Sequence, residues 1–130
     1  ITYNGSGTNA TVESNLTFDG SSLSLTGDIA MNTNISIQTS RQTVTTTSTL
    51  FGLSSYNAVI MDYMAKNGSN LRAGTIVGVW DGSNSKLTET TTTDLGDTTA
   101  VSFSVSNNGT VSATVSSGTW TITGFARALS

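Results

Sequence analysis

Three carboxylates near the middle of the sequence are the side chains best suited to act as a catalytic acid or base. Asp94 and Asp97 lie three positions apart, and Glu89 precedes them. A glycosidase would need two carboxyl groups that face each other across a cleft in different environments. Aspartates in a segment that contains a glycine, here Gly96, more often form a solvated turn. We therefore interpret the two aspartates as turn formers and expect no glycosidase site.

The segment Asp81-Gly82-Ser83-Asn84-Ser85 carries oxygen atoms that a calcium ion could bind. An EF-hand loop needs alternating oxygen ligands, a central glycine and a closing glutamate. Here the glycine is second and no glutamate closes the loop, so a hairpin turn explains the segment better. The sequence predicts no metal site and no cofactor within one chain. An ion on a symmetry axis stays open, because several chains could share its ligands.

The residue types that the chain lacks exclude whole classes of function. Its 130 residues include no His, Cys or Pro, so no imidazole base, thiol nucleophile, disulfide, or His or Cys metal ligand is available. Lys66 and Lys86 lie beside turn residues, where an ammonium group is normally solvated. Five Lys and Arg against eight Asp and Glu disfavour nucleic acid and anionic membranes as partners. We expect a protein that is not an enzyme and does not insert into a membrane.

Thr, Ser, Asn and Gly make up just over half of the chain, yet the pattern indicates an ordered all-β protein. Apolar residues recur at every second position, and Thr is a β-branched residue that suits a pleated sheet. No long segment has the spacing of an amphipathic helix. The first residue is Ile rather than Met, so we expect the chain to be a piece or a processed product of a longer protein.

Residues 1–40 read as very short strands separated by turns such as Asp19-Gly20 and Gly27-Asp28. Each strand offers only two or three inward side chains, which is too few to enclose a core. We expect this segment to be a shaft in which identical chains wind around a common axis. The side chains predicted to pack between chains are Leu16, Phe18, Leu23, Leu25, Ile29, Ile35 and Ile37.

Residues 41–49 carry a single Val44 among polar residues and are interpreted as a linker or an exposed strand. Residues 50–130 contain six candidate strands with turn signals at regular spacing, which predicts an antiparallel β-sandwich of the jelly-roll kind. The clearest signal is the turn at 107–109, between two strands that alternate Val or Ala with Ser or Thr. Trp120 shares the apolar face of the last strand and is assigned to the core.

The remaining aromatic residues are candidates for contact with a receptor, because aromatic rings can stack on sugar rings. Trp80 ends a strand beside a turn, and Tyr63 lies in the strand before it. Four loops, at 66–70, 81–85, 94–98 and 107–109, are the expected contact regions. The residues predicted to bind a receptor are Tyr63, Trp80, Asn67, Asn70 and Asn84.

The stretch Leu16–Ile29, LTFDGSSLSLTGDI, resembles a motif that recurs in bacteriophage tail fibres and other virion appendage proteins. The stretch Arg72–Gly82, RAGTIVGVWDG, is similar to the β domain that often follows this motif, ending near 119–122. The resemblance implies a homotrimer at the virion surface that contacts other virion proteins and helps attach to a glycan or protein of the host. Such fibres are often much longer, so this chain would be a short fibre or a fragment.

Two other functions fit the same sequence. The first is a carbohydrate-binding or adhesin module of a bacterial surface protein, which would act as a monomer or dimer. The second is a capsid decoration or neck protein, which would differ from a tail fibre in its docking partner. The mass in solution separates the module from the fibre.

Overall fold

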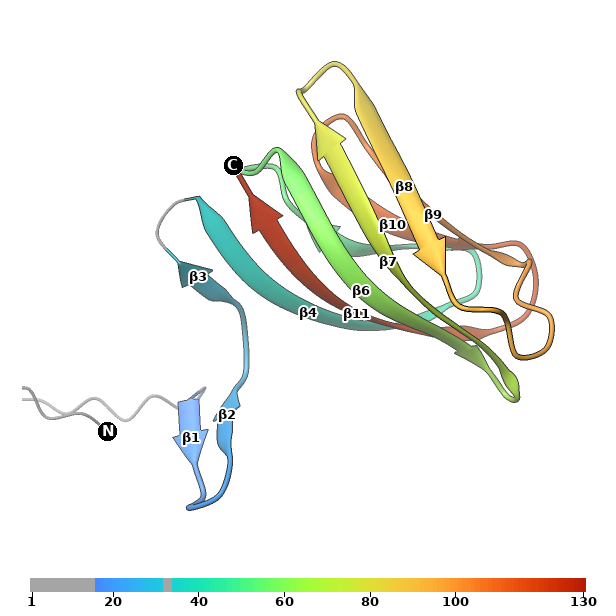
Figure 1. The fold of residues 1–130 in the computed structure, drawn as a ribbon, viewed down its shortest axis with the longest axis horizontal. Helices are drawn as coiled ribbons and strands as arrows, with labels where there is room; N and C mark the ends of the chain where they lie inside the picture. The colour runs from blue at the N-terminus through green and yellow to red at the C-terminus, as the bar shows by residue number, and fades with distance from the viewer. Residues whose placement is uncertain (1–15, 32–33) are drawn as a thin grey trace, which may run out of the picture.

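The structure is a computed structural model that describes residues 16–31 and 34–130 (Figure 1). Over these residues the chain forms strands and no helix, as the sequence predicts. The strands are β1 (Leu16–Phe18), β2 (Leu23–Leu25), β3 (Ile29–Met31), β4 (Ile35–Val44), β5 (Thr47–Gly52), β6 (Ala58–Asn67), β7 (Asn70–Trp80), β8 (Ser85–Thr91), β9 (Val101–Val105), β10 (Thr110–Val115) and β11 (Trp120–Leu129). The predictions for residues 1–15 and 32–33 of the shaft lie outside the described residues.

Two antiparallel sheets pack face to face (Figure 1). The larger has six strands in the order β3-β4-β11-β6-β7-β8, and the smaller has three in the order β5-β10-β9. Strands β1 and β2 form a separate hairpin. The prediction of an all-β, antiparallel sandwich is therefore confirmed, with the two layers unequal in size.

The core between the sheets follows from the alternation of side chains along the strands. On β11, Trp120 and Ile122 point inward and are almost completely buried. Met61 and Ile76 do the same from β6 and β7, and burying a side chain of this size stabilises the fold by about 2 kcal/mol. The small sheet contributes its own inward row, which consists of Phe51, Val101, Val105, Val111, Ala113 and Val115.

Two glycines let the backbone and the core rings approach each other. A Cβ atom on Gly124 would lie 3.2–3.3 Å from the ring of Phe51 and the sulfur of Met61. Gly109, in the predicted turn between β9 and β10, has a φ of +79°, and a Cβ atom there would lie 2.6 Å from the indole of Trp80. A larger residue at 109 would meet both backbone strain and a clash with the core.

Residues 41–49 were interpreted as a linker or an exposed strand, and the structure shows strands there in place of a linker. Strand β4 pairs with β11 along its whole length, from Ile35 to Val44, and β5 pairs with β10. The polar residues there are Thr, Ser, Gln and Arg on a paired strand, and Thr favours that conformation. The sandwich therefore takes in β3, β4 and β5, and its predicted start at residue 50 is corrected to an earlier one.

The hairpin of β1 and β2 lies apart from the sandwich, beyond the β3 edge of the large sheet (Figure 1). Its register places Leu16 opposite Leu25 and Phe18 opposite Leu23, so all four apolar side chains share one face. All four are exposed, and Phe18 and Leu23 are 69% and 72% accessible. No described part of the chain covers this face. That identical chains cover it stays a prediction.

Candidate functional site

The most reactive side chains of the interior form a polar cluster on the inner face of the large sheet. Arg72 pairs with Glu89 at 3.3 Å between Nη2 and Oε1, and its Nε donates a 2.9 Å hydrogen bond to the Tyr63 hydroxyl. That hydroxyl donates in turn to the Glu89 carboxylate. Arg72 Nη2 also donates to the carbonyl oxygen of Val101 at 3.0 Å. Because Val101 opens β9, the cluster ties the large sheet to the small one.

The electrostatics of this cluster favour a structural role. Burial raises the pKa of Tyr63, and its hydrogen bond to the Glu89 carboxylate raises that pKa further. The phenol therefore stays protonated at neutral pH and is no base or nucleophile. Its ring also packs against Phe103, with the ring centroids 4.4 Å apart. Each of the three side chains is thus bonded to the other two.

The aspartates that the sequence assigned to turns are found in turns. Asp81 accepts hydrogen bonds from the backbone N–H groups of Asn84 and Ser83, which lower its pKa. The Thr99 hydroxyl and N–H group likewise lower the pKa of Asp97, and Asp94 accepts a hydrogen bond from the Thr98 hydroxyl. Within residues 16–31 and 34–130, no group of three or more acidic side chains could hold a metal ion. The same residues form no helix that could cross a membrane.

Two of the predicted receptor contacts are corrected by the structure. The side chains of Tyr63 and Trp80 are only 4% and 5% exposed, so neither ring can stack on a ligand at the surface. Tyr63 has the same parity as Val59 and Met61 on β6, and Trp80 has the same parity as Ile76 on β7. Strand alternation therefore turns both rings into the core.

The predicted contact loops separate into two pairs at opposite ends of the sandwich. The loops at 66–70 and 94–98 meet where the N–H of Asp97 donates to Asn70 Oδ1 at 3.2 Å. The loops at 81–85 and 107–109 meet where Asn107 Nδ2 donates to the carbonyl oxygen of Ser83 at 2.6 Å. Asn67 and Asn70 consequently lie at one end and Asn84 at the other. The structure does not bring these three residues into one site.

The outer face of the large sheet carries an apolar belt that runs across the strands. Cross-strand pairing aligns its residues in two neighbouring rows, because each residue lies directly opposite its partner on the next strand. The belt is defined as Met31, Ile35, Leu129, Ala58 and Val79 in the first row, and Ile29, Ile37, Arg127, Ile60 and Val77 in the second. Val77 is 48% exposed, and no described segment covers the belt. Contiguous apolar surface of this kind marks an interaction site.

The predicted inter-chain residues Ile29, Ile35 and Ile37 all belong to this belt, on β3 and β4. They share the outer face with the basic residues of the chain. Arg41, Lys66, Lys86 and Arg127 are exposed there beside a single carboxylate, Asp62. This face is therefore positively charged although the whole chain is negative.

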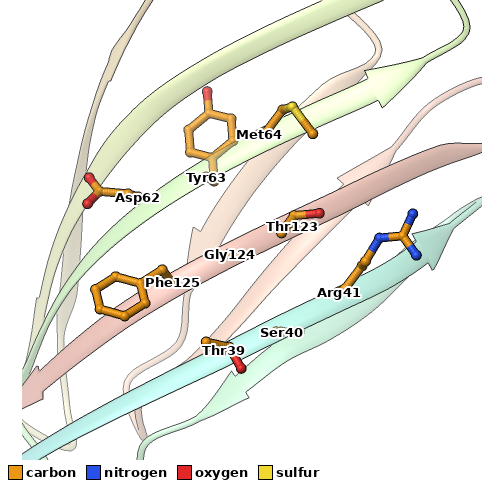
Figure 2. A pocket seen from close by; sticks show the side chains of 9 residues that line it. All are labelled: Thr39, Ser40, Arg41, Asp62, Tyr63, Met64, Thr123, Gly124 and Phe125. Atoms are coloured by element: carbon orange, nitrogen blue, oxygen red, sulfur yellow. The ribbon is translucent and has the colours of Figure 1, made fainter. Parts of the chain in front are cut away.

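Next to the belt, the same face is hollowed (Figure 2). The open hollow has a volume of about 440 Å³. Asp62, Phe125 and Thr39 border it along one row of the sheet, and Met64, Thr123 and Arg41 along the next. It thus offers an aromatic ring, a carboxylate, a guanidinium and hydroxyl groups to one ligand. Such a combination suits a polar ring compound such as a sugar.

Apart from Tyr63, whose ring faces the core, the sequence analysis missed the residues of the hollow, and it missed most of the belt. A signal for them exists, because β6, β7 and β11 each carry apolar residues at both parities, as in Val59-Ile60-Met61 and Ile76-Val77. A strand with one face in water should alternate, whereas an apolar run indicates cover on both faces. These runs therefore predict a partner for the outer face.

Comparisons with known proteins bear on the fold. No protein-family model and no curated protein matches the sequence. Among solved structures, the fold is similar to the crystal structure of the Acinetobacter phage vB_ApiP_P1 tailspike protein, with 13% sequence identity and a TM-score of 0.41. The match covers 96% of this chain and 26% of that chain, so this chain spans about a quarter of the tailspike's length. A likeness of this degree carries no argument about function, which we derive from the surfaces described above.

Proposed function

We propose that the protein is a non-enzymatic structural component of a virion surface, similar to a tail fibre, that assembles as a homotrimer and contributes to host attachment. The observation that carries the proposal is the uncovered apolar surface on the β1–β2 hairpin and on the belt. A single chain cannot hide this surface, and identical chains are the simplest source of cover. The resemblance of Leu16–Ile29 to a tail-fibre motif supports the same reading.

Attachment is assigned to the hollow beside the belt. Phe125 offers a ring face, and Asp62 and Arg41 can accept and donate hydrogen bonds at its rim. One shallow site of this kind binds weakly. Three copies on one fibre raise the overall affinity, because after the first site binds, the others meet the ligand at a high local concentration. The ligand is a glycan or a polar protein surface of the host, and the fibre's base contacts other virion proteins.

The same hollow supports a second candidate function, a carbohydrate-binding or adhesin module of a bacterial surface protein. Its chemistry does not depend on a trimer, so a stable monomer that binds sugars would favour this module. A capsid decoration or neck protein would share the trimer and the fold, and would bind to the capsid in place of the tail.

The mass in solution tests the proposal. We expect a mass three times 13.4 kDa by analytical ultracentrifugation. We also expect the urea midpoint of unfolding to rise with protein concentration, because dissociation and unfolding are then linked. A monomeric mass with a midpoint independent of concentration would contradict the homotrimer. A glycan array, read for the intact protein and for Phe125→Ala, then tests the hollow, and loss of a sugar signal in the variant is expected.

A further inference from the structure

We propose that the apolar face of the β1–β2 hairpin of one chain packs on the belt of the next chain, so that each copy is both donor and acceptor. The inference rests on the proposed function, because it needs identical chains to assemble. It goes further by naming which surface of one copy meets which surface of the other. The contact is head-to-tail, unlike an interface in which the same surface meets itself.

The two surfaces match in chemistry. The hairpin presents four apolar side chains on one face, and its other face carries Thr17 and Ser24. The belt presents two rows of side chains that are apolar except for Arg127. The four apolar side chains of the hairpin are exposed in their own chain, and so are most of the apolar side chains of the belt. Bringing them together removes both from water, which is the main favourable term in association.

Their charges decide which surface pairs with which. The hairpin, Leu16–Leu25, contains Asp19 and no Lys or Arg. Asp19 lies at the hairpin turn, where the N–H groups of Ser21 and Ser22 lower its pKa and keep it ionised. The face that carries the belt has four basic residues and one acidic residue. The hairpin and the belt are therefore electrostatically complementary.

The alternative pairings oppose like charges. Two belts facing each other would bring Arg127 and Lys86 of one copy toward the same basic face of another. Two hairpins facing each other would bring Asp19 of one copy toward Asp19 of another. Like charges across an interface disfavour association. The hairpin of the same chain is also placed beyond the β3 edge, clear of its own belt (Figure 1).

Cross-linking between two single-cysteine variants tests the pairing, since the chain has no cysteine of its own. Leu23→Cys marks the hairpin, and Val77→Cys marks the belt. We expect a short bismaleimide to link the two variants when they are coexpressed, and to link neither variant when it is expressed alone. Ser104→Cys, on the exposed face of the small sheet, is the matched control and should not be linked to Leu23→Cys. Each variant is first checked to have the wild-type mass.

A second experiment tests the charges without cysteine. Arg127→Glu should weaken assembly about tenfold, and Asp19→Lys at the hairpin turn should do the same. The double variant should recover most of the loss, because the opposite charges then face each other again.

The outcomes separate this inference from the proposed function. Self-linking of Leu23→Cys alone, or of Val77→Cys alone, would overturn the head-to-tail pairing while the trimer stands. A trimer with no linking in the coexpressed pair would overturn it in the same way. A wild-type protein that is monomeric would overturn the trimer and the pairing together.

Discussion

The outer faces of the two sheets differ in almost every respect. On the small sheet, the outward side chains form two rows made only of Ser and Thr, which are Ser104-Ser112-Thr49 and Ser102-Thr114-Thr47. Thr47 and Thr114 share a hydrogen bond of 3.0 Å between their hydroxyl oxygens. On the large sheet, the outward residues include the belt, four basic side chains and the hollow. One face is neutral and polar, and the other is apolar and charged.

The difference shows how one sandwich can serve two environments. Ser and Thr hydroxyl groups can hydrogen-bond to water along the whole face. Such a face offers no large apolar side chain for a partner to cover. Exposing aliphatic rows to water is unfavourable, so covering them with another surface lowers the free energy. We therefore expect the small sheet to face solvent in the assembled protein and the large sheet to be its contact side.

The largest expected effect comes from placing charge on the contact side. The double variant Val77→Asp, Val79→Asp should lower the affinity between chains roughly thousandfold, because each valine contributes about 2 kcal/mol when buried. Sedimentation at micromolar concentration should then give a mass near 13.4 kDa. The matched pair Ser102→Asp, Ser104→Asp on the small sheet should leave the mass unchanged. Equal effects of the two pairs would remove the distinction between the faces.

A smaller effect separates the interior cation from the cations of the contact side. Arg72→Met leaves Glu89 beside Tyr63 without its partner and cuts the bond to the Val101 carbonyl, so the free energy of unfolding should fall by about 3 kcal/mol. Arg127→Met removes an exposed charge and should change the stability of the dissociated chain by less than about 0.5 kcal/mol. Urea unfolding of both variants at low concentration measures the two values. A similar loss in both would mean that Arg127 is also part of the folded core.

The smallest effect concerns the pH dependence of stability. A raised pKa for Tyr63 means that folding favours its neutral form, so its contribution is complete below the ordinary tyrosine pKa of about 10 and is lost as the pH rises above it. The unfolding free energy of the wild type should fall more steeply between about pH 9 and 11 than that of Tyr63→Phe. Each protein is compared with its own value at pH 7, because the substitution also removes two hydrogen bonds. Parallel curves would contradict the burial of this hydroxyl.

Much of the sandwich could be predicted from local patterns. The turn at Asn107-Asn108-Gly109 joins β9 and β10, and Val105 pairs with Val111 across it, as the alternation predicts. Trp120 is buried, because it follows the parity of Ile122. Turn residues and period-two alternation are properties of neighbouring positions, so they can be recognised without knowledge of the rest of the fold.

The parts that were missed depend on residues far apart in the sequence. Strand β4 shows no apolar alternation toward the core, because its inward residues Ser36 and Ser40 are polar and Val44 is the apolar exception. Only its pairing with β11 identifies it as a strand. The belt likewise consists of side chains from five strands, and no local window contains more than a few of them. The prediction for Tyr63 and Trp80 was wrong for a different reason. Their positions in the strand alternation indicated burial, but their nearness to turns was given more weight.

Within the described residues, the guanidinium of Arg127 stands alone among the aliphatic side chains of the belt, and no ion pair joins it to another residue. Any surface that covers the belt without an acidic group in the right place must bury this charge unpaired, which costs several kcal/mol. An unrelated protein with an apolar patch, or an identical chain docked out of register, would therefore bind more weakly. One positive charge thus makes an apolar surface selective for a partner with a matching acidic group. It also favours the solubility of the chain before assembly.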